Sequence, residues 1–225
     1  MKKYILCLFA FLALAGCSDD NDNMPTVKPS ASGTFTDERD GTTYAWARYG
    51  SLEWTTTNLA YVPASGTFRP TLTPDGAYDD PWNHEFYDKF GGLYDYTAAV
   101  ASVLDGWRIP SDEDWQNLEK LFGMSDADLG SKGARGKHAG DLMKQGDTGT
   151  GFALGLAGCY VNDGYYSGFY DGEAVGYYWS STLDPEKDNG LSRLYRMVIF
   201  NNGKVTREST GGPSLFSVRL VRDAS

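Results

Sequence analysis

The sequence contains few of the residues that most often perform catalysis or bind metals. Only three cysteines (Cys7, Cys17 and Cys159) and two histidines (His84 and His138) occur among 225 residues. Cys7 and Cys17 lie in or beside an apolar amino-terminal stretch, so Cys159 is left without an intramolecular disulfide partner. Both histidines lie in irregular segments, and the nucleophile-elbow pattern Gly-x-Ser-x-Gly does not occur. An enzyme is therefore the least favoured class of function, and Cys159 is predicted to be a buried residue rather than a reactive thiol.

Positive charge is also scarce. Twenty lysines and arginines are set against thirty aspartates and glutamates, which gives a formal net charge of −10. Removal of residues 1–16 takes away two lysines and no acidic residue, so the charge of the remaining chain becomes −12. Because such an acidic surface repels phosphate backbones, nucleic acid is not expected as a partner.

No hydrophobic run is long enough to cross a bilayer. The apolar run at residues 4–14 has 11 residues, whereas a transmembrane helix needs about 20. Two lysines precede this run and small residues follow it, a pattern typical of a secretory signal peptide over residues 1–16. The segment Leu14-Ala15-Gly16-Cys17 resembles the lipobox of bacterial lipoproteins. That resemblance implies lipidation of Cys17 and attachment of the protein to a membrane through acyl chains.

The residues after Cys17 indicate where the protein is displayed. The acidic run Ser18-Asp19-Asp20-Asn21-Asp22 resembles an export signal that sends some lipoproteins to the outer face of the outer membrane. A soluble spacer is the alternative interpretation of the same residues. We expect an outer-membrane lipoprotein that faces the cell exterior.

The chain divides into three parts. Residues 1–16 form the signal peptide, and residues 17–33 comprise Cys17 and a tether that is predicted to be disordered because it contains no aromatic residue. Residues 34–225 form one domain, long enough to bury about 70% of the surface of its unfolded chain. Most of the six tryptophans, fifteen tyrosines and eleven phenylalanines lie in this domain and supply its core.

Local patterns predict short strands, Gly-containing turns and two helices. Residues 96–104 are rich in alanine and valine, and residues 111–122 carry an N-cap with an approximate capping box at Ser111 and an apolar stripe. Residues 62–89 contain four prolines and are predicted to be a long irregular insertion. A hairpin turn is predicted at residues 201–203, between two segments that alternate in polarity.

Seven blocks of residues occur in the order and approximate spacing of a known family. The blocks include Asp40-Gly41 with Trp54 and Asn58-Leu59, Gly92-Leu93-Tyr94, Gly106-Trp107-Arg108-Ile109-Pro110-Ser111-Asp112, Ala139-Gly140, Gly151-Phe152, Tyr178-Trp179-Ser180-Ser181-Thr182 and Ser217-Val218-Arg219. They resemble the FISUMP domain, the major paralogous domain of Fibrobacter succinogenes, over residues 35–223. The resemblance implies an exported domain and no established activity.

The resemblance also implies a fold. The block that begins at Gly106 is similar to a stretch of formylglycine-generating enzymes and, more distantly, of C-type-lectin-like domains. We therefore expect an α+β, C-type-lectin-like fold, with two helices packed on short twisted antiparallel sheets and long loops. FISUMP relatives commonly have cysteines where this chain has Val103 and Leu220. If those cysteines are paired in the relatives, an apolar contact replaces a disulfide here. Formylglycine-generating enzymes bind copper through cysteines, and Cys159 alone cannot form a two-thiolate site.

A tyrosine- and glycine-rich stretch is the best candidate for a ligand-binding site. Seven aromatic residues fall within residues 160–178, interleaved with glycines and with amide and carboxylate side chains. Flat rings suit the C–H faces of sugars, and tyrosine is also favoured in loops that bind proteins. Some of the rings, including Phe169 and Tyr178, are predicted to belong to the core instead. The candidate ligand-binding residues are Tyr165, Tyr166, Tyr170, Trp82, Asn162 and Asp163.

Oxygen-rich side chains in the insertion are a weaker candidate for a metal site. Asp79, Asp80 and Asn83 place several oxygen ligands close together, and calcium requires about six to eight of them. A solvated acidic loop is the favoured alternative, because the Glu-Pro-Asn signature of calcium-dependent lectins is absent. No other cofactor is expected, and no residue is assigned a catalytic role.

These observations favour a surface lipoprotein that displays a binding module, with a glycan or another surface protein as its ligand. A structural role, as an assembly or tip subunit of an extracellular fibre, is the alternative. A binding module should present exposed tyrosines in a concavity with polar neighbours. A fibre subunit should present a large apolar patch or an unpaired strand edge.

Overall fold

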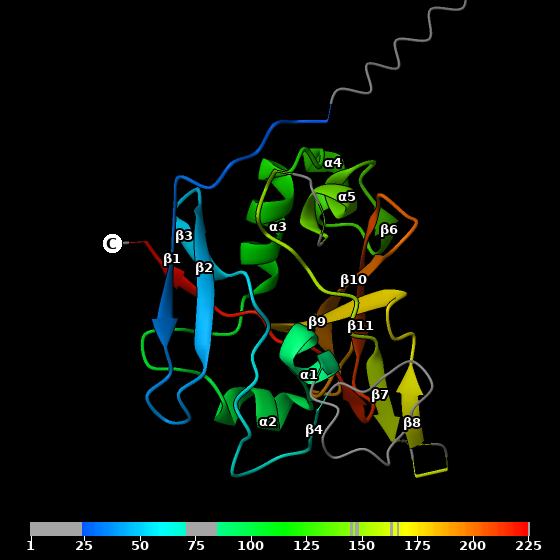
Figure 1. Ribbon diagram of the computed structural model, residues 1–225. Coiled ribbons are helices and arrows are strands. Elements are labelled where there is room, and N and C mark those ends of the chain that lie inside the picture. The colour runs from blue at the N-terminus through cyan, green and yellow to red at the C-terminus, as the bar shows by residue number, and fades with distance from the viewer. Residues whose placement is uncertain are drawn as a thin grey trace, which may run out of the picture.

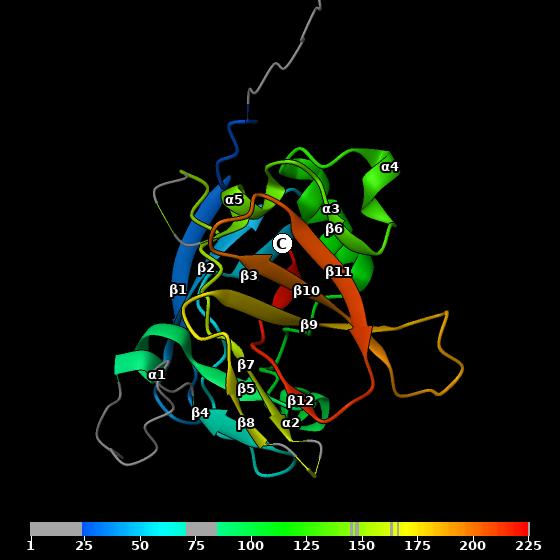
Figure 2. The ribbon, with the colours of Figure 1, turned by 90° about the vertical axis from the view of Figure 1, so that its right-hand side faces the viewer.

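Several antiparallel sheets and a few short helices form the fold. The computed structural model describes residues 24–224, with the exception of 71–84, 145, 147–148, 163 and 166. Figure 1 shows the two larger sheets on opposite sides of helix α3 (Asp112–Leu121). Figure 2 shows the strands of two smaller sheets gathered at the end of the domain that lies away from α3, at the bottom of the view. The predicted α+β class is confirmed, with more strand than helix.

The first sheet joins the two ends of the described chain. Its strands lie in the order β1 (Ala31–Thr36), β2 (Thr43–Tyr49), β3 (Leu52–Thr55) and β13 (Val221–Asp223), and all neighbours are antiparallel. The turn between β1 and β2 contains Gly41, whose φ of +81° lies in the left-handed region that glycine favours.

Strand β1 begins inside the segment that was predicted to be a disordered tether. Ala31 pairs with Arg48, and a Cβ atom on Gly33 would lie only 3.0 Å from the indole ring of Trp46. The segment has no aromatic residue of its own, but Trp46 on the neighbouring strand covers it. The domain therefore begins no later than Ala31, before the boundary predicted at residue 34.

The second large sheet is built mainly from the carboxyl-terminal third of the chain. Its strands lie in the order β6 (Gly133–Arg135), β11 (Val205–Thr210), β10 (Arg193–Ile199) and β9 (Val175–Leu183). The hairpin predicted at residues 201–203 is confirmed, because β10 and β11 pair on either side of that turn with Val198 opposite Val205.

The described part of the chain also contains two smaller sheets. One has the order β12 (Ser214–Leu215), β7 (Cys159–Asn162) and β8 (Ser167–Tyr170), and the other pairs β4 (Phe68–Pro70) with β5 (Gly92–Tyr94). Strand β4 lies in the segment that was predicted to be irregular. Its pairing is supported by an aromatic contact that crosses from Phe68 to Tyr94, with ring centroids 5.0 Å apart.

Among the described residues, five short helices connect the strands. They are α1 (Glu85–Phe90), α2 (Tyr96–Ala101), α3, α4 (Asp126–Leu129) and α5 (Ala139–Met143). The capping box of α3 is confirmed, because the Ser111 hydroxyl accepts from the Asp114 N–H and the Asp114 carboxylate accepts from the Ser111 N–H. Helix α2 ends at Ala101 rather than at the predicted residue 104. Directly after this end, the Ser102 hydroxyl donates a hydrogen bond to the Ala98 carbonyl oxygen. Helices α1, α4 and α5 were not predicted, because they are too short to show a periodic pattern.

An aromatic core lies around α3, between the two large sheets. The Trp115 ring on α3 lies 4.9 Å from Trp54 of β3 and 6.2 Å from Tyr178 of β9. Phe152 contacts the same cluster, with its ring 5.5 Å from Trp54 and 5.6 Å from Tyr49. These side chains are all buried. Their contacts fix the two sheets to a common helix.

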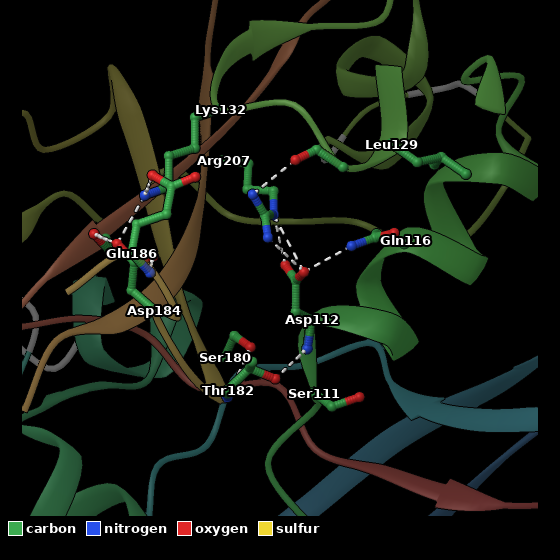
Figure 3. Close-up of polar contacts among 12 residues, drawn as sticks. Ser111, Asp112, Gln116, Leu129, Lys132, Ser180, Thr182, Asp184, Glu186 and Arg207 are labelled. Atoms are coloured by element: carbon green, nitrogen blue, oxygen red, sulfur yellow. Dashed lines mark hydrogen bonds and ion pairs between the residues drawn. The ribbon is translucent and has the colours of Figure 1, made fainter. Parts of the chain in front are cut away.

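Buried ion pairs hold α3 to the second large sheet. The Asp112 carboxylate accepts hydrogen bonds from Arg196 on β10 at 2.7 Å and from Arg207 on β11 at 2.8 Å. The Glu119 carboxylate accepts from the same Arg196 and from Arg135 on β6, each at 2.6 Å. Figure 3 shows the Asp112 carboxylate facing the guanidinium group of Arg207. Since these groups are almost fully buried, each charge depends on its partners for compensation.

The Asp112 network predicts a loss of stability in acid. Burial alone would raise the pKa of Asp112, but the hydrogen bonds and charges of Arg207 and Arg196 outweigh it and lower the pKa from 3.8 to about 2. A carboxylate with a depressed folded-state pKa stabilises the fold above its unfolded pKa, and this contribution is lost as the pH falls from about 4 through about 2. A shift of this size corresponds to about 2 kcal/mol.

Denaturant titrations across this pH range test the prediction. The free energy of unfolding should fall more steeply between about pH 5 and pH 2 in the wild type than in Asp112→Asn, which has no carboxylate to protonate. The exposed Asp105→Asn should follow the wild type. Parallel pH profiles for the wild type and Asp112→Asn would contradict the assignment.

Candidate functional site

Strands β7 and β8 form a hairpin whose two faces pack against the domain. Cys159 lies opposite Tyr170, and Tyr160 lies opposite Phe169 with the two rings 4.9 Å apart, edge to face. Tyr160 and Phe169 pack on one side of the hairpin, whereas Cys159 packs in a different cluster that includes Trp179. The tip of the hairpin is therefore carried by strands whose positions are fixed by packing.

This hairpin presents aromatic side chains to solvent. Tyr165 at its tip is 85% exposed, and Tyr170, which lies opposite Cys159 at its base, is 46% exposed, as the sequence predicts. Asn162, the last residue of β7, is also exposed. Gly164 precedes Tyr165 with a φ of +82°, which glycine adopts without strain. The predicted burial of Tyr178 is confirmed, and Phe169 is partly buried.

The exposed tyrosines lie on a hairpin and not in the cavities of the domain that we describe. Three cavities of about 540, 310 and 210 Å³ are lined by other residues. The expectation of a concavity around Tyr165 and Tyr170 is therefore not met by these cavities. A side chain that protrudes in this way can insert into a partner or stack on it, but it cannot enclose a small ligand.

The remaining predicted site residues lie outside the described part of the chain. They are Cys17, Asp79, Asp80, Trp82, Asn83, Asp163 and Tyr166. Among the residues that are described, no group of three histidine, cysteine, aspartate or glutamate side chains is arranged to hold a metal ion. Over the same residues, no helix combines the length and the apolar composition needed to cross a membrane.

The lone cysteine of the domain is a structural residue. Cys159 is only 6% exposed, and burial, with a smaller effect from the charge of Asp171, raises the pKa of its thiol to about 12. The thiol therefore stays protonated at neutral pH and is a poor nucleophile.

A second group of aromatic side chains begins at the base of the hairpin. The Tyr177 hydroxyl on β9 donates a hydrogen bond to the carboxylate of Asp171, the residue after β8, at 2.7 Å. Burial and this hydrogen bond raise the pKa of Tyr177, so its hydroxyl remains a neutral donor. The Tyr177 ring stacks on Phe216 at 5.2 Å, and Tyr195 of β10 contacts the same Phe216 ring at 5.0 Å.

Three residues that were not predicted to belong to a binding site extend this aromatic surface. They are Tyr96, Arg193 and Tyr195, all partly exposed. The Arg193 guanidinium lies 3.7 Å above the ring of Tyr96, which in turn contacts Trp179. Side chains along strand β10 alternate strictly between buried and partly exposed. This alternation is the signal in the sequence that could have placed Arg193 and Tyr195 on the outer face of the strand. We call Tyr96, Tyr177, Tyr195 and Arg193 the aromatic strip.

The two surfaces carry groups that are suited to stacking and hydrogen bonding. The hairpin tip and the aromatic strip offer flat rings, and beside them lie the Asn162 amide, the Asp171 carboxylate and the Arg193 guanidinium. Rings of this kind supply contact area at a low cost in conformational entropy, and the polar groups orient a ligand.

Several blocks that carry the family resemblance have structural roles. Arg108 pairs with Asp114 at the start of α3, and the Trp107 ring stacks on Phe35 at 5.0 Å. Val103 and Leu220, the positions at which the resemblance implies cysteines, belong to one hydrophobic cluster. These blocks explain how the domain folds and not what it binds.

One domain family matches most of the chain. No curated protein and no solved structure matches it. The domain described as the Fibrobacter succinogenes major domain matches residues 47–222, a span that includes both the β7–β8 hairpin and the aromatic strip. The chain therefore belongs to the Fibrobacter succinogenes major domain family.

Proposed function

We propose that this protein is a lipid-anchored binding module, without catalytic activity, on the outer face of the outer membrane. The anchor is supported by the basic start, the short apolar run and the Leu14-Ala15-Gly16-Cys17 segment. Two or three acyl chains on Cys17 would hold the protein stably, whereas one chain would hold it only marginally. The acidic residues that follow Cys17 support export to the cell surface.

A C-type-lectin-like arrangement is the finer fold assignment that we propose. It is supported by the two helices α2 and α3, by the short antiparallel sheets and by the similarity of the Gly106 block to domains of that kind. A solved structure of this chain, compared with such domains, is the direct test of the assignment.

The ligand that the site supports best is a glycan or another surface protein. The observation that carries this proposal is the 85% exposure of Tyr165 at the tip of a hairpin whose base is packed. Large aromatic side chains that are exposed to solvent are typical of surfaces that bind partners. A calcium ion bound by Asp79, Asp80 and Asn83 is a minor proposal that rests on the sequence alone, and no other cofactor is proposed.

Replacement of Tyr165 and Tyr170 together by alanine should weaken ligand binding by about tenfold or more, because buried aromatic anchors dominate most interfaces. The ligand is first sought with the purified protein on a glycan array and in pull-downs from bacterial and host surface extracts. The affinity of each hit is then measured by biolayer interferometry for the wild type and the double variant. Thermal unfolding should be almost unchanged, since both side chains are exposed.

Leu191→Ala is the matched control for this experiment. Leu191 is 70% exposed and lies in the loop after β9, so it tests the loss of an exposed apolar side chain away from the hairpin. Unchanged binding in Leu191→Ala together with a loss in the double variant would support the proposal. Equal binding by the wild type and the double variant, or no ligand in either screen, would count against it.

A structural role as a fibre subunit is favoured by a different observation. Strands β1 and β8 lie at the edges of their sheets, each with one neighbour among the described strands. Such edges can accept a strand from another copy of the chain. Analytical ultracentrifugation over a wide range of concentrations separates the two proposals, because a binding module should remain monomeric and a fibre subunit should form open-ended polymers.

A further inference from the structure

One buried arginine differs from the others in its electrostatic surroundings. Arg135, Arg196 and Arg207 are buried and are each paired with the carboxylate of Asp112 or Glu119. Arg219 is equally buried, at 1% exposure, yet no ion pair with a carboxylate is found for it among the described residues. Burial lowers the pKa of Arg219, as expected for a guanidinium that lacks a compensating anion.

The Arg219 guanidinium is held by oxygen dipoles instead of a charge. Its donors go to the side-chain oxygen of Asn58 at 2.7 Å and to the backbone carbonyl oxygens of Thr55, Phe152 and Ala153, at 2.8, 3.2 and 2.5 Å. These contacts fix the position of the guanidinium without neutralising it. A full positive charge therefore remains inside the domain.

A cavity lies beside this charge. Its volume is about 210 Å³, and its wall includes Arg219, Asn58 and a second cation, Lys89. The other lining residues, Thr56, Thr57, Ala153 and Gly155, are uncharged, and no carboxylate lines the cavity in the part of the chain that the structure describes. The cavity is thus locally positive in a chain whose net charge is −10.

Lys89 is placed to bind a ligand directly. Its ammonium group lies 4.7 Å from the centre of the Phe90 ring and 3.6 Å from the Glu173 carboxylate, and both ionic side chains are about half exposed. An exposed ion pair at that distance contributes little and exchanges readily for another anion. Lys89 and Glu173 also line an adjacent cavity of about 310 Å³.

Backbone strain is concentrated at the same place. Three described residues other than glycine have a positive φ, and two of them, Ala153 at 53° and Glu173 at 61°, line these two cavities. Strain of this kind is found preferentially at ligand sites.

We infer that the cavity beside Arg219 and Lys89 binds a small oxyanion, a carboxylate or phosphate group. Arg219 supplies a fixed positive charge behind the ligand, and the Lys89 ammonium donates hydrogen bonds to it in place of its contact with Glu173. The cavity is smaller than the roughly 300 to 1,000 Å³ of sites that enclose drug-sized ligands, so it suits one anionic group. This inference is independent of the hairpin and of the binding role proposed for it.

Calorimetric titration of the purified protein with sodium acetate and with inorganic phosphate, at constant ionic strength set by sodium chloride, tests the inference. At least one of the two should bind saturably and raise the melting temperature. Lys89→Gln should weaken that binding about tenfold, the usual effect of losing a charge-assisted hydrogen bond. Galacturonate in a further arm distinguishes a carboxylate carried on a sugar, which should bind more tightly than acetate, from a free one.

Lys120→Gln is the matched control, since Lys120 is also an exposed, ion-paired lysine on a helix but lies at the end of α3. It should bind the anion as the wild type does. The double variant of Tyr165 and Tyr170 should also retain anion binding. The outcome of the anion titration therefore does not depend on whether the hairpin binds a ligand. No saturable binding of either anion, or equal weakening by Lys89→Gln and Lys120→Gln, would overturn the inference.

Discussion

Replacement of Glu119 by glutamine should destabilise the domain by about 3 to 5 kcal/mol, the usual cost of breaking a buried ion pair from one side. The Glu119 side chain has no exposed surface and accepts hydrogen bonds from Arg196 and Arg135, each at 2.6 Å. Glutamine fills almost the same volume, but its neutral amide compensates neither guanidinium. Arg135 would then lose its carboxylate partner, and Arg196 would share Asp112 with Arg207 as its compensating group.

Urea or guanidinium unfolding followed by tryptophan fluorescence measures this effect. Glu113→Gln is the matched control, because Glu113 lies on the same helix with its side chain in solvent. It should change the free energy of unfolding by no more than about 0.5 kcal/mol. A similar small change for Glu119→Gln would show that the network around Arg196 does not stabilise the fold.

Phe152→Ala should destabilise the domain by a comparable amount, about 3 to 5 kcal/mol. Phe152 has no exposed surface, and its ring contacts Tyr49, Trp54 and Trp115 at 5.5 to 6.3 Å, mostly edge to face. The ring also lies 5.5 Å below the Arg219 guanidinium. Truncation would open a void among rigid aromatic rings that cannot collapse into it, and it would remove one favourable neighbour of a buried cation.

Phe200→Ala provides the comparison for this substitution, because Phe200 is 61% exposed in the turn after β10. The same chemical change there should cost less than about 0.5 kcal/mol. Differential scanning calorimetry of both variants gives the difference directly. Equal melting temperatures for Phe152→Ala and Phe200→Ala would contradict the place of Phe152 at the centre of the core.

Features that depend on neighbouring residues were predictable from the sequence. The capping box of Ser111 and Asp114 is contained within four consecutive residues, and the structure reproduces it. The exposure of Tyr165 follows from its position after a turn glycine. The Asn201-Asn202-Gly203 turn was likewise recognisable, since its flanking segments alternate in polarity on both sides.

Features that depend on distant residues were not predictable. Asp112 belongs to a recognised sequence block, but its partners Arg196 and Arg207 lie 84 and 95 positions away. No local pattern shows that three arginines converge on α3, or that Arg219 donates its hydrogen bonds to carbonyl and amide oxygens instead of a carboxylate. The first residues of β1, from Ala31 to Gly33, were assigned to the tether for the same reason, because their order comes from Trp46 on the strand beside them.

The position of β1 has a mechanical consequence. In both ribbon views the chain enters the domain at the end opposite the β7–β8 hairpin and continues along β1 (Figures 1 and 2). A pull between the amino-terminal segment and a ligand held on the hairpin would therefore act roughly along this strand. The six residue pairs that join β1 to β2 would bear the load together, in shear, instead of separating one after another. Under the anchored binding role that we propose, such a junction would resist tension between the anchor and the ligand.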